Sequence, residues 1–165
     1  MFFNNNSPTV EVKDNFLSSY EFEKLSSFLL SDDFCWFYSD CNVVENDGGM
    51  QYFHNFYNLN GVKSHYFFLL DPLLYRIGAS RLWRVKANTT FKGRFKRRSK
   101  YHIDYKNVKT AIFYINTNNG GTKFKNGKFI KSVANRIVFF DSNIEHRGVY
   151  CTNEKRRVVI NLNYN

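Results

Sequence analysis

The second half of the chain is a succession of short segments rich in β-branched and aromatic residues, and this feature constrains the fold most. After residue 80 these segments read RLWRVKA, KYHID, KTAIFYIN, KFIKSVA, RIVFFD and RRVVINLNY, with turn residues between them. The spacing predicts six or more short strands, which is typical of a β-sandwich or jelly roll. The clearest turn, NTNNGGTKF, is predicted to be a hairpin, because it lacks the Lys-Ser/Thr pair and the helix of a phosphate-binding loop.

The first eighty residues show a different pattern of apolar residues. TVEVK alternates like a short strand, whereas Phe22, Leu25, Phe28 and Leu29 recur at helical spacing and predict a helix over residues 18–31. FCWFYS is a strand or a buried turn, and VENDGGMQY is predicted to be a loop.

SHYFFLLDPLLYRIGA, residues 64–79, predicts a further helix, interrupted or restarted at Pro72 and ended at Gly78. Helices first and strands second favour a mainly β member of the α+β class, with the N-terminal helices packed on one sheet. No linker is visible, so we expect one domain over residues 1–165. Its helical front half would span about 14–80 and its jelly-roll core about 81–165.

The composition limits the classes of protein to which this chain can belong. Hydrophobic residues make up 43% of the 165, which excludes a disordered chain, and the net charge of +10 favours anionic partners, nucleic acid above all. The three cysteines have spacings unlike a disulfide framework, which favours a reducing, cytoplasmic location. MFFNNNSPTV lacks the features of a signal peptide, and no apolar run approaches the ~20 residues of a membrane helix.

The stretch RSKYHIDYK contains the clearest candidate metal ligands. On a strand, His102 and Asp104 would project from the same face, close enough to bind one ion. Of the other histidines, His54 and His65 lie in the helical half, whereas His146 follows the segment RIVFFDS. Two histidines and one carboxylate are the ligand set of non-haem iron(II) oxygenases. The alternative is a pair of polar strand residues beside a nucleic-acid-binding patch.

The motifs HID, GGTKF, RIVFFDSNIEHRGV and RRVVINLNY, in this order, resemble the iron(II)/2-oxoglutarate-dependent oxygenase superfamily in its prolyl-4-hydroxylase-like branch. The likeness extends loosely to VKDNFLSSYEFEKL, and small bacterial and phage members are the most similar. It implies a double-stranded β-helix that holds Fe(II) through His102, Asp104 and His146, with 2-oxoglutarate and O2 as cosubstrates and ascorbate as a candidate reductant. It also implies hydroxylation of a C–H bond with release of succinate and CO2. Asp104 favours hydroxylation over halogenation, which needs a small residue at that position.

The resemblance implies a basic residue on the last strand that pairs with the far carboxylate of 2-oxoglutarate. Strand alternation favours Arg157, which shares a mixed polar face with Val159 and Asn161, over Arg156, which shares an apolar face with Val158. Arg156 remains the alternative and is otherwise a surface charge.

Two further pocket residues are candidates. Tyr114 follows the His-x-Asp motif on the next predicted strand, where related enzymes place a hydroxyl near the cosubstrate. Asn88 ends the strand before the motif. A core aromatic ring and a turn amide are the simpler alternatives for these two residues.

The substrate is the least constrained feature. The resemblance suggests a protein or peptide residue, and proline is the first candidate. A basic loop over 92–100 includes a candidate patch for an acidic peptide or nucleic acid, formed by Arg94, Lys96, Arg97 and Arg98. Two alternatives remain. One is a basic nucleic-acid-binding module without enzyme activity, and the other is a protein that binds a metal but does not respond to 2-oxoglutarate. The richness in Asn, Lys, Phe and Tyr suggests a phage or bacterial source, with the host cytoplasm as the location for a phage protein.

Overall fold

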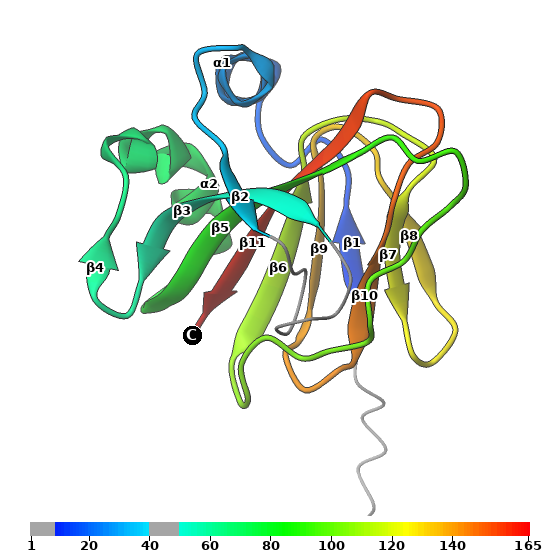
Figure 1. Cartoon of the computed structure of the whole chain (residues 1–165). Coiled ribbons are helices and arrows are strands. Elements are labelled where there is room, and N and C mark those ends of the chain that lie inside the picture. The colour runs from blue at the N-terminus through cyan, green and yellow to red at the C-terminus, as the bar shows by residue number, and fades with distance from the viewer. Residues whose placement is uncertain (1–8, 40–49) are drawn as a thin grey trace, which may run out of the picture.

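The computed structural model describes residues 9–39 and 50–165, which form two antiparallel sheets and a set of helices (Figure 1). The larger sheet contains, in spatial order, β1 (Glu11–Lys13), β9 (Arg136–Asp141), β6 (Lys109–Tyr114), β11 (Arg156–Tyr164), β5 (Leu82–Phe91), β3 (Gln51–Asn58) and β2 (Phe37–Ser39), with β4 (Gly61–Val62) paired to β3. The smaller sheet has the order β10 (His146–Val149), β7 (Gly121–Phe124) and β8 (Phe129–Lys131). Two packed sheets with helices outside the larger one confirm the predicted jelly-roll class.

The helices begin and end at the signals that the sequence carries. Helix α1 (Ser19–Leu30) starts at a capping box, in which Ser18 and Glu21 satisfy each other's backbone N–H groups. The second helical region divides into a 3-10 helix, η1 (His65–Leu70), and α2 (Asp71–Ile77), which has Pro72 in its first turn. Gly78 ends α2 with a φ of 67°, a left-handed conformation that glycine adopts readily.

Two hydrophobic cores lie on opposite faces of the larger sheet, and strand β11 contributes to both. Val158, Ile160 and Leu162 pack with buried residues of the helices, whereas Val159 packs toward the smaller sheet. The helix-side core includes Leu17, Leu25, Leu29, Phe34, Phe56, Leu70, Leu73, Val85, Phe113 and Ile137. The core between the sheets consists of Ile112, Tyr114, Phe124, Ile130, Val138, Phe140 and Val159. Polar residues on the second face therefore point into the space between the sheets.

The first eighty residues contribute more strand than their periodicity predicts. β3 pairs with both β2 and β5, so it extends the larger sheet beyond the predicted jelly-roll segments. The segment KYHID, in contrast, is not a strand: only the isolated bridges of Arg98 with Val149 and of His102 with His146 tie this region to β10. Asp104 therefore lies in a turn, and strand alternation does not explain why it faces His102.

The glycine turn also differs from the prediction. It is not a hairpin, because β6 pairs with β9 and β11, whereas β7 pairs with β10 and β8, so the segment crosses between sheets. A Cβ added at Gly120 would lie 2.5 Å from the Val149 carbonyl oxygen and 3.1 Å from Cδ of Arg157. Glycine is thus needed here for the close passage of the crossover over β10 and Arg157.

Some predictions fall outside the described residues, namely those for residues 1–8, for Cys41 and for most of the loop over 44–52. Within residues 9–39 and 50–165, no helix has the length and apolar character that a membrane span requires.

Candidate metal centre

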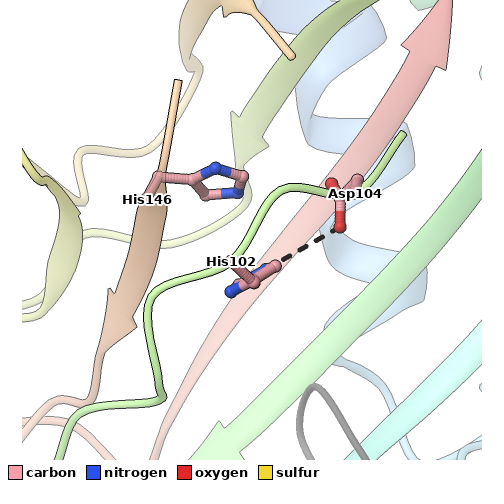
Figure 2. Close-up of side chains that lie close together, drawn as sticks. All are labelled: His102, Asp104 and His146. Atoms are coloured by element: carbon pink, nitrogen blue, oxygen red, sulfur yellow. Dashed lines mark ion pairs between the residues drawn. The ribbon is translucent and has the colours of Figure 1, made fainter. Parts of the chain in front are cut away.

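His102, Asp104 and His146 come together between the two sheets (Figure 2). Their potential ligand atoms all lie within 4.8 Å of one another, and His102 Nε2 is 3.7 Å from Asp104 Oδ1. His146 is on β10, while the other two residues lie in the segment between β5 and β6, held to β10 by two 3.0 Å backbone hydrogen bonds between His102 and His146. Among the described residues this is the sole cluster of His, Cys, Asp or Glu with such geometry.

Both histidines are held in the tautomer that suits a metal ligand. Nδ1 of His102 donates to the Lys100 carbonyl at 3.1 Å, and Nδ1 of His146 donates to the Ile144 carbonyl at 3.2 Å. A carbonyl oxygen can only accept, so in each ring the tautomer with its proton on Nδ1 is the one that fits. The lone pair of each Nε2 is therefore available to an ion.

Asp104 is ionised and oriented by two residues of the larger sheet. Nη2 of Arg84 on β5 donates to Oδ1 at 2.8 Å, and Nδ2 of Asn163 on β11 lies 3.5 Å from Oδ2. Burial, the largest single effect, would raise the pKa of this carboxyl, but the charge and hydrogen bond of Arg84 act together with His146 and His102, and the pKa is lowered. Asn163 is itself oriented by a 3.0 Å hydrogen bond to Thr110.

His146 forms the dry side of the cluster. Its ring is 4.8 Å from that of Phe140, 6.3 Å from that of Phe124, and the residue is only 2% exposed. Burial lowers the pKa of His146 to about 4, so the ring is neutral near pH 7. A neutral imidazole is the form that binds a metal.

The cluster lies in a polar pocket on the inner face of the larger sheet. The other lining residues alternate along β5 and β11 and continue onto β3, β6, β7 and the segment beside β10: Gln51, Arg84, Lys86, Asn88, Thr90, Ser99, Ile112, Thr122, Gly148, Tyr150, Arg157, Val159 and Asn161. Among the described residues that line the pocket, Asp104 is the one carboxylate, against three cationic side chains. The pocket is therefore suited to an anionic ligand.

Arg157 is buried in this pocket without a carboxylate partner among the described residues. Its Nε donates to Ser132 Oγ at 3.1 Å, and its Nη2 lies 3.4 Å from Thr122 Oγ1. Burial lowers the pKa of the guanidinium, because the charged form loses its water. A buried cation without an anion is costly, and an anionic ligand would compensate it.

Arg156 points to the other side of the sheet, as the alternation predicts. It is half-buried rather than a free surface charge, and its guanidinium donates to the carbonyl of Leu30, the last residue of α1. That carbonyl has no partner within the helix, so Arg156 caps α1.

The two weaker candidates lie at different depths. Asn88 lines the pocket, and its Oδ1 is buried without a hydrogen-bond partner in the described part of the chain. Tyr114 is fully buried behind the lining, and its hydroxyl donates to Thr122 Oγ1 at 2.8 Å. Tyr114 would therefore act on a ligand in the pocket through Thr122 and through Arg157, whose guanidinium lies 5.6 Å from the centroid of the tyrosine ring.

Comparison with solved structures relates this arrangement to one group of enzymes. A 2OG-Fe(II) oxygenase family oxidoreductase from Burkholderia pseudomallei has a TM-score of 0.71 at 10% identity, over 94% of this chain and 84% of that one. A Pseudomonas putida prolyl-4-hydroxylase has a TM-score of 0.63 at 13% identity, over 96% and 93%. The fold is that of the 2-oxoglutarate-dependent iron oxygenases.

A third structure with this oxygenase fold is the epimerase SnoN from nogalamycin biosynthesis, with a TM-score of 0.64 at 13% identity over 96% of this chain and 78% of that one. SnoN has also been solved with Fe3+ and α-ketoglutarate bound. No protein-family model matches the sequence, and no curated protein does.

The side chains of the pocket fit the cofactors of the oxygenase fold. Thr90 lies opposite Arg157 in the pairing of β5 with β11, and its Oγ1 is buried without a hydrogen-bond partner within residues 9–39 and 50–165. Oδ1 of Asn161 is likewise buried, and no described residue forms a hydrogen bond with it. Three potential ligands on one side and Arg157 with two threonine hydroxyls on the other match a metal and a dicarboxylate.

Sequence reasoning missed Arg84, Thr90, Thr122 and Asn163. The first two could have been found from alternation, because β5 carries Arg84, Asn88 and Thr90 on one face. The others depend on which strands are neighbours in space, and no local pattern contains that information.

Proposed function

We propose that this protein is an Fe(II)- and 2-oxoglutarate-dependent dioxygenase that hydroxylates a C–H bond of a protein or peptide residue, with proline as the first candidate. The observation that carries the proposal is Arg157, a buried guanidinium without a carboxylate partner among the described residues, in the same pocket as His102, Asp104 and His146. This pairing of a candidate metal-ligand cluster with a candidate carboxylate-binding group supports the proposal.

The roles follow from the contacts. His102, Asp104 and His146 would hold the iron, and Arg157 with Thr90 and Thr122 would hold the far carboxylate of 2-oxoglutarate. When bound, the iron, 2-oxoglutarate and O2 supply the oxidation, which releases succinate and CO2 and places one oxygen atom in the substrate C–H bond. Asn88 would contact the cosubstrate or the substrate at the edge of this cradle.

Other residues prepare the site. Arg84 and Asn163 fix the Asp104 carboxylate, and Phe124 and Phe140 keep water from His146. With Asp104 on the metal, a halide has no vacant protein position to occupy, which favours hydroxylation. We treat the chain as one catalytic domain, since the Pseudomonas putida structure aligns over 96% of it.

A peptide substrate is supported by the fold likeness to a prolyl-4-hydroxylase. Nucleic acid is the second candidate, favoured by the net charge of +10 and by the exposed cations Arg94, Lys96, Arg97 and Arg98. We place the reaction in the cytoplasm of a bacterium or of a phage-infected cell, and the free thiols of Cys35 and Cys151 fit a reducing compartment.

The test is succinate formation with proline-containing peptides, Fe(II), 2-oxoglutarate and ascorbate, followed by mass spectrometry for one added oxygen atom. We expect turnover that needs both Fe(II) and 2-oxoglutarate. His102→Ala should reduce it at least about a hundredfold, whereas His65→Ala, at an exposed histidine of η1, should retain it. Salt-sensitive binding of nucleic acid without any 2-oxoglutarate turnover would contradict the proposal and favour a binding module.

A further inference from the structure

The segment between β5 and β6 runs beside β10 (Figure 1), and its bridges to β10 extend from Arg98 to His102 of the metal cluster. Tyr150 N donates to the Arg97 carbonyl at 2.9 Å, and Ser99 N donates to the Gly148 carbonyl at 3.0 Å. The pairing resumes, shifted by one residue, at His102, which bonds His146. We call residues 97–101 the basic edge. It is a strand-like extension of the smaller sheet and ends next to a candidate iron ligand.

The outer side of the basic edge has open backbone groups. Hydrogen bonds to β10 use the Arg97 carbonyl and the Ser99 N–H on either side of Arg98, so by alternation the Arg98 N–H and the Arg98 carbonyl point away from β10. No hydrogen bond within the described parts of the chain reaches these two groups. An edge of this kind can accept an added strand.

The charge of the edge is uniformly positive. Arg97, Arg98 and Lys100 are exposed, and none forms an ion pair with an acid of the described residues. Arg147 on the adjoining β10 lies over the Tyr101 ring, 4.2 Å from its centroid. Lysine and arginine on an edge strand also prevent aggregation. Here, however, the cations continue into a pocket in which the one carboxylate of the described lining, Asp104, is already paired with Arg84.

We propose that the basic edge docks an acidic peptide as an added strand, with glutamate or aspartate side chains over its cations and the residue to be hydroxylated at the metal pocket. This inference rests on the proposed function and specifies its substrate class. A peptide fits better than nucleic acid, because the outward N–H and C=O groups match another peptide backbone. Nucleic acid would engage the cations alone.

The probe is a fluorescein-labelled synthetic peptide in which one proline is flanked by alternating glutamate and alanine, and binding to the full chain is followed by fluorescence anisotropy. We expect it to bind at least about tenfold more tightly than the same peptide with glutamine in place of glutamate. Equal affinity for the two peptides would overturn the charge argument.

The matched variants remove three cations each. Arg97→Gln/Arg98→Gln/Lys100→Gln should weaken binding of the glutamate peptide about tenfold. The control removes the same charge at exposed lysines elsewhere, Lys24→Gln/Lys63→Gln/Lys131→Gln, and should change binding less than about twofold. An equal loss in both variants would mean a general effect of net charge and would overturn the inference.

Two further measurements separate the alternatives. N-methylation of alternate peptide residues should abolish binding if the peptide adds a strand, and unchanged binding would contradict that geometry. Tighter binding of oligothymidylate than of the glutamate peptide would assign the surface to nucleic acid instead. Peptide binding is measured without iron, so its absence in a protein that still turns over 2-oxoglutarate rejects only this inference.

Discussion

Arg84 on β5 donates to the Asp104 carboxylate at 2.8 Å, so one oxygen of a candidate iron ligand is engaged by the larger sheet. The contact keeps the carboxylate ionised and fixes its direction. Groups that orient metal ligands in this way typically contribute about 10- to 100-fold to metal affinity.

We therefore expect Arg84→Gln to weaken binding of Mn(II), a redox-stable substitute for Fe(II), roughly 10- to 100-fold in calorimetric titration. Arg84→Lys should restore part of the affinity, because it keeps the charge but loses the planar geometry. The control is Arg81→Gln, at an exposed arginine of the same region. Unchanged Mn(II) affinity in Arg84→Gln would show that Asp104 needs no such partner.

The adjacent arginines Arg156 and Arg157 should behave oppositely. Arg157→Gln removes the buried cation of the pocket, and we expect about 10- to 100-fold weaker binding of 2-oxoglutarate, as for the loss of a charged hydrogen-bond pair. Arg156→Gln removes the cap on α1 and should lower the unfolding free energy by about 1 kcal/mol without changing cosubstrate affinity. An affinity loss in Arg156→Gln alone would reverse the assignment.

The Tyr114 hydroxyl contacts Thr122, and Thr122 lines the pocket. Thr122→Val should therefore weaken binding of 2-oxoglutarate more than Tyr114→Phe, which should mainly cost about 1 kcal/mol of unfolding free energy through one lost buried hydrogen bond. Both quantities can be measured on the same variants by anaerobic titration and urea unfolding. A larger affinity loss in Tyr114→Phe would mean that the tyrosine reaches the cosubstrate directly.

His54 predicts a pH dependence of stability. Burial lowers the pKa of this ring, whose Nδ1 donates to the Cys35 carbonyl at 2.7 Å and whose Nε2 accepts from Ser64 at 2.8 Å. The unfolded chain then binds the proton more readily than the folded one, so the unfolding free energy falls as pH drops below about 6.5. His54→Gln should be less stable at pH 7 and should show a smaller decline toward pH 5 in urea unfolding. Parallel curves for the two proteins would exclude this role.

Features encoded by local periodicity could be predicted from the sequence. Alternation along the last strand places Arg157 in the pocket and Arg156 against the helices, as observed. The capping box of α1 and the glycine end of α2 follow from a few adjacent residues.

Features that depend on distant pairing could not be predicted. Thr122 becomes a pocket residue because the glycine segment crosses between sheets, and Asp104 meets Arg84 from a turn rather than from a strand. β3 was missed because its aromatic residues occupy both faces, which hides the alternation of a strand. The grouping of His102 and Asp104 with the distant His146 followed from family resemblance, since spacing alone does not place His146 beside them.

The most direct test is an anaerobic titration of the metal-free protein with Fe(II) and then 2-oxoglutarate, followed by visible absorption. A charge-transfer band that requires both additions, is lost in His102→Ala and is weakened in Arg157→Ala would establish the paired metal and carboxylate sites. Absence of the band, with Fe(II) shown to remain unbound, would contradict the oxygenase assignment.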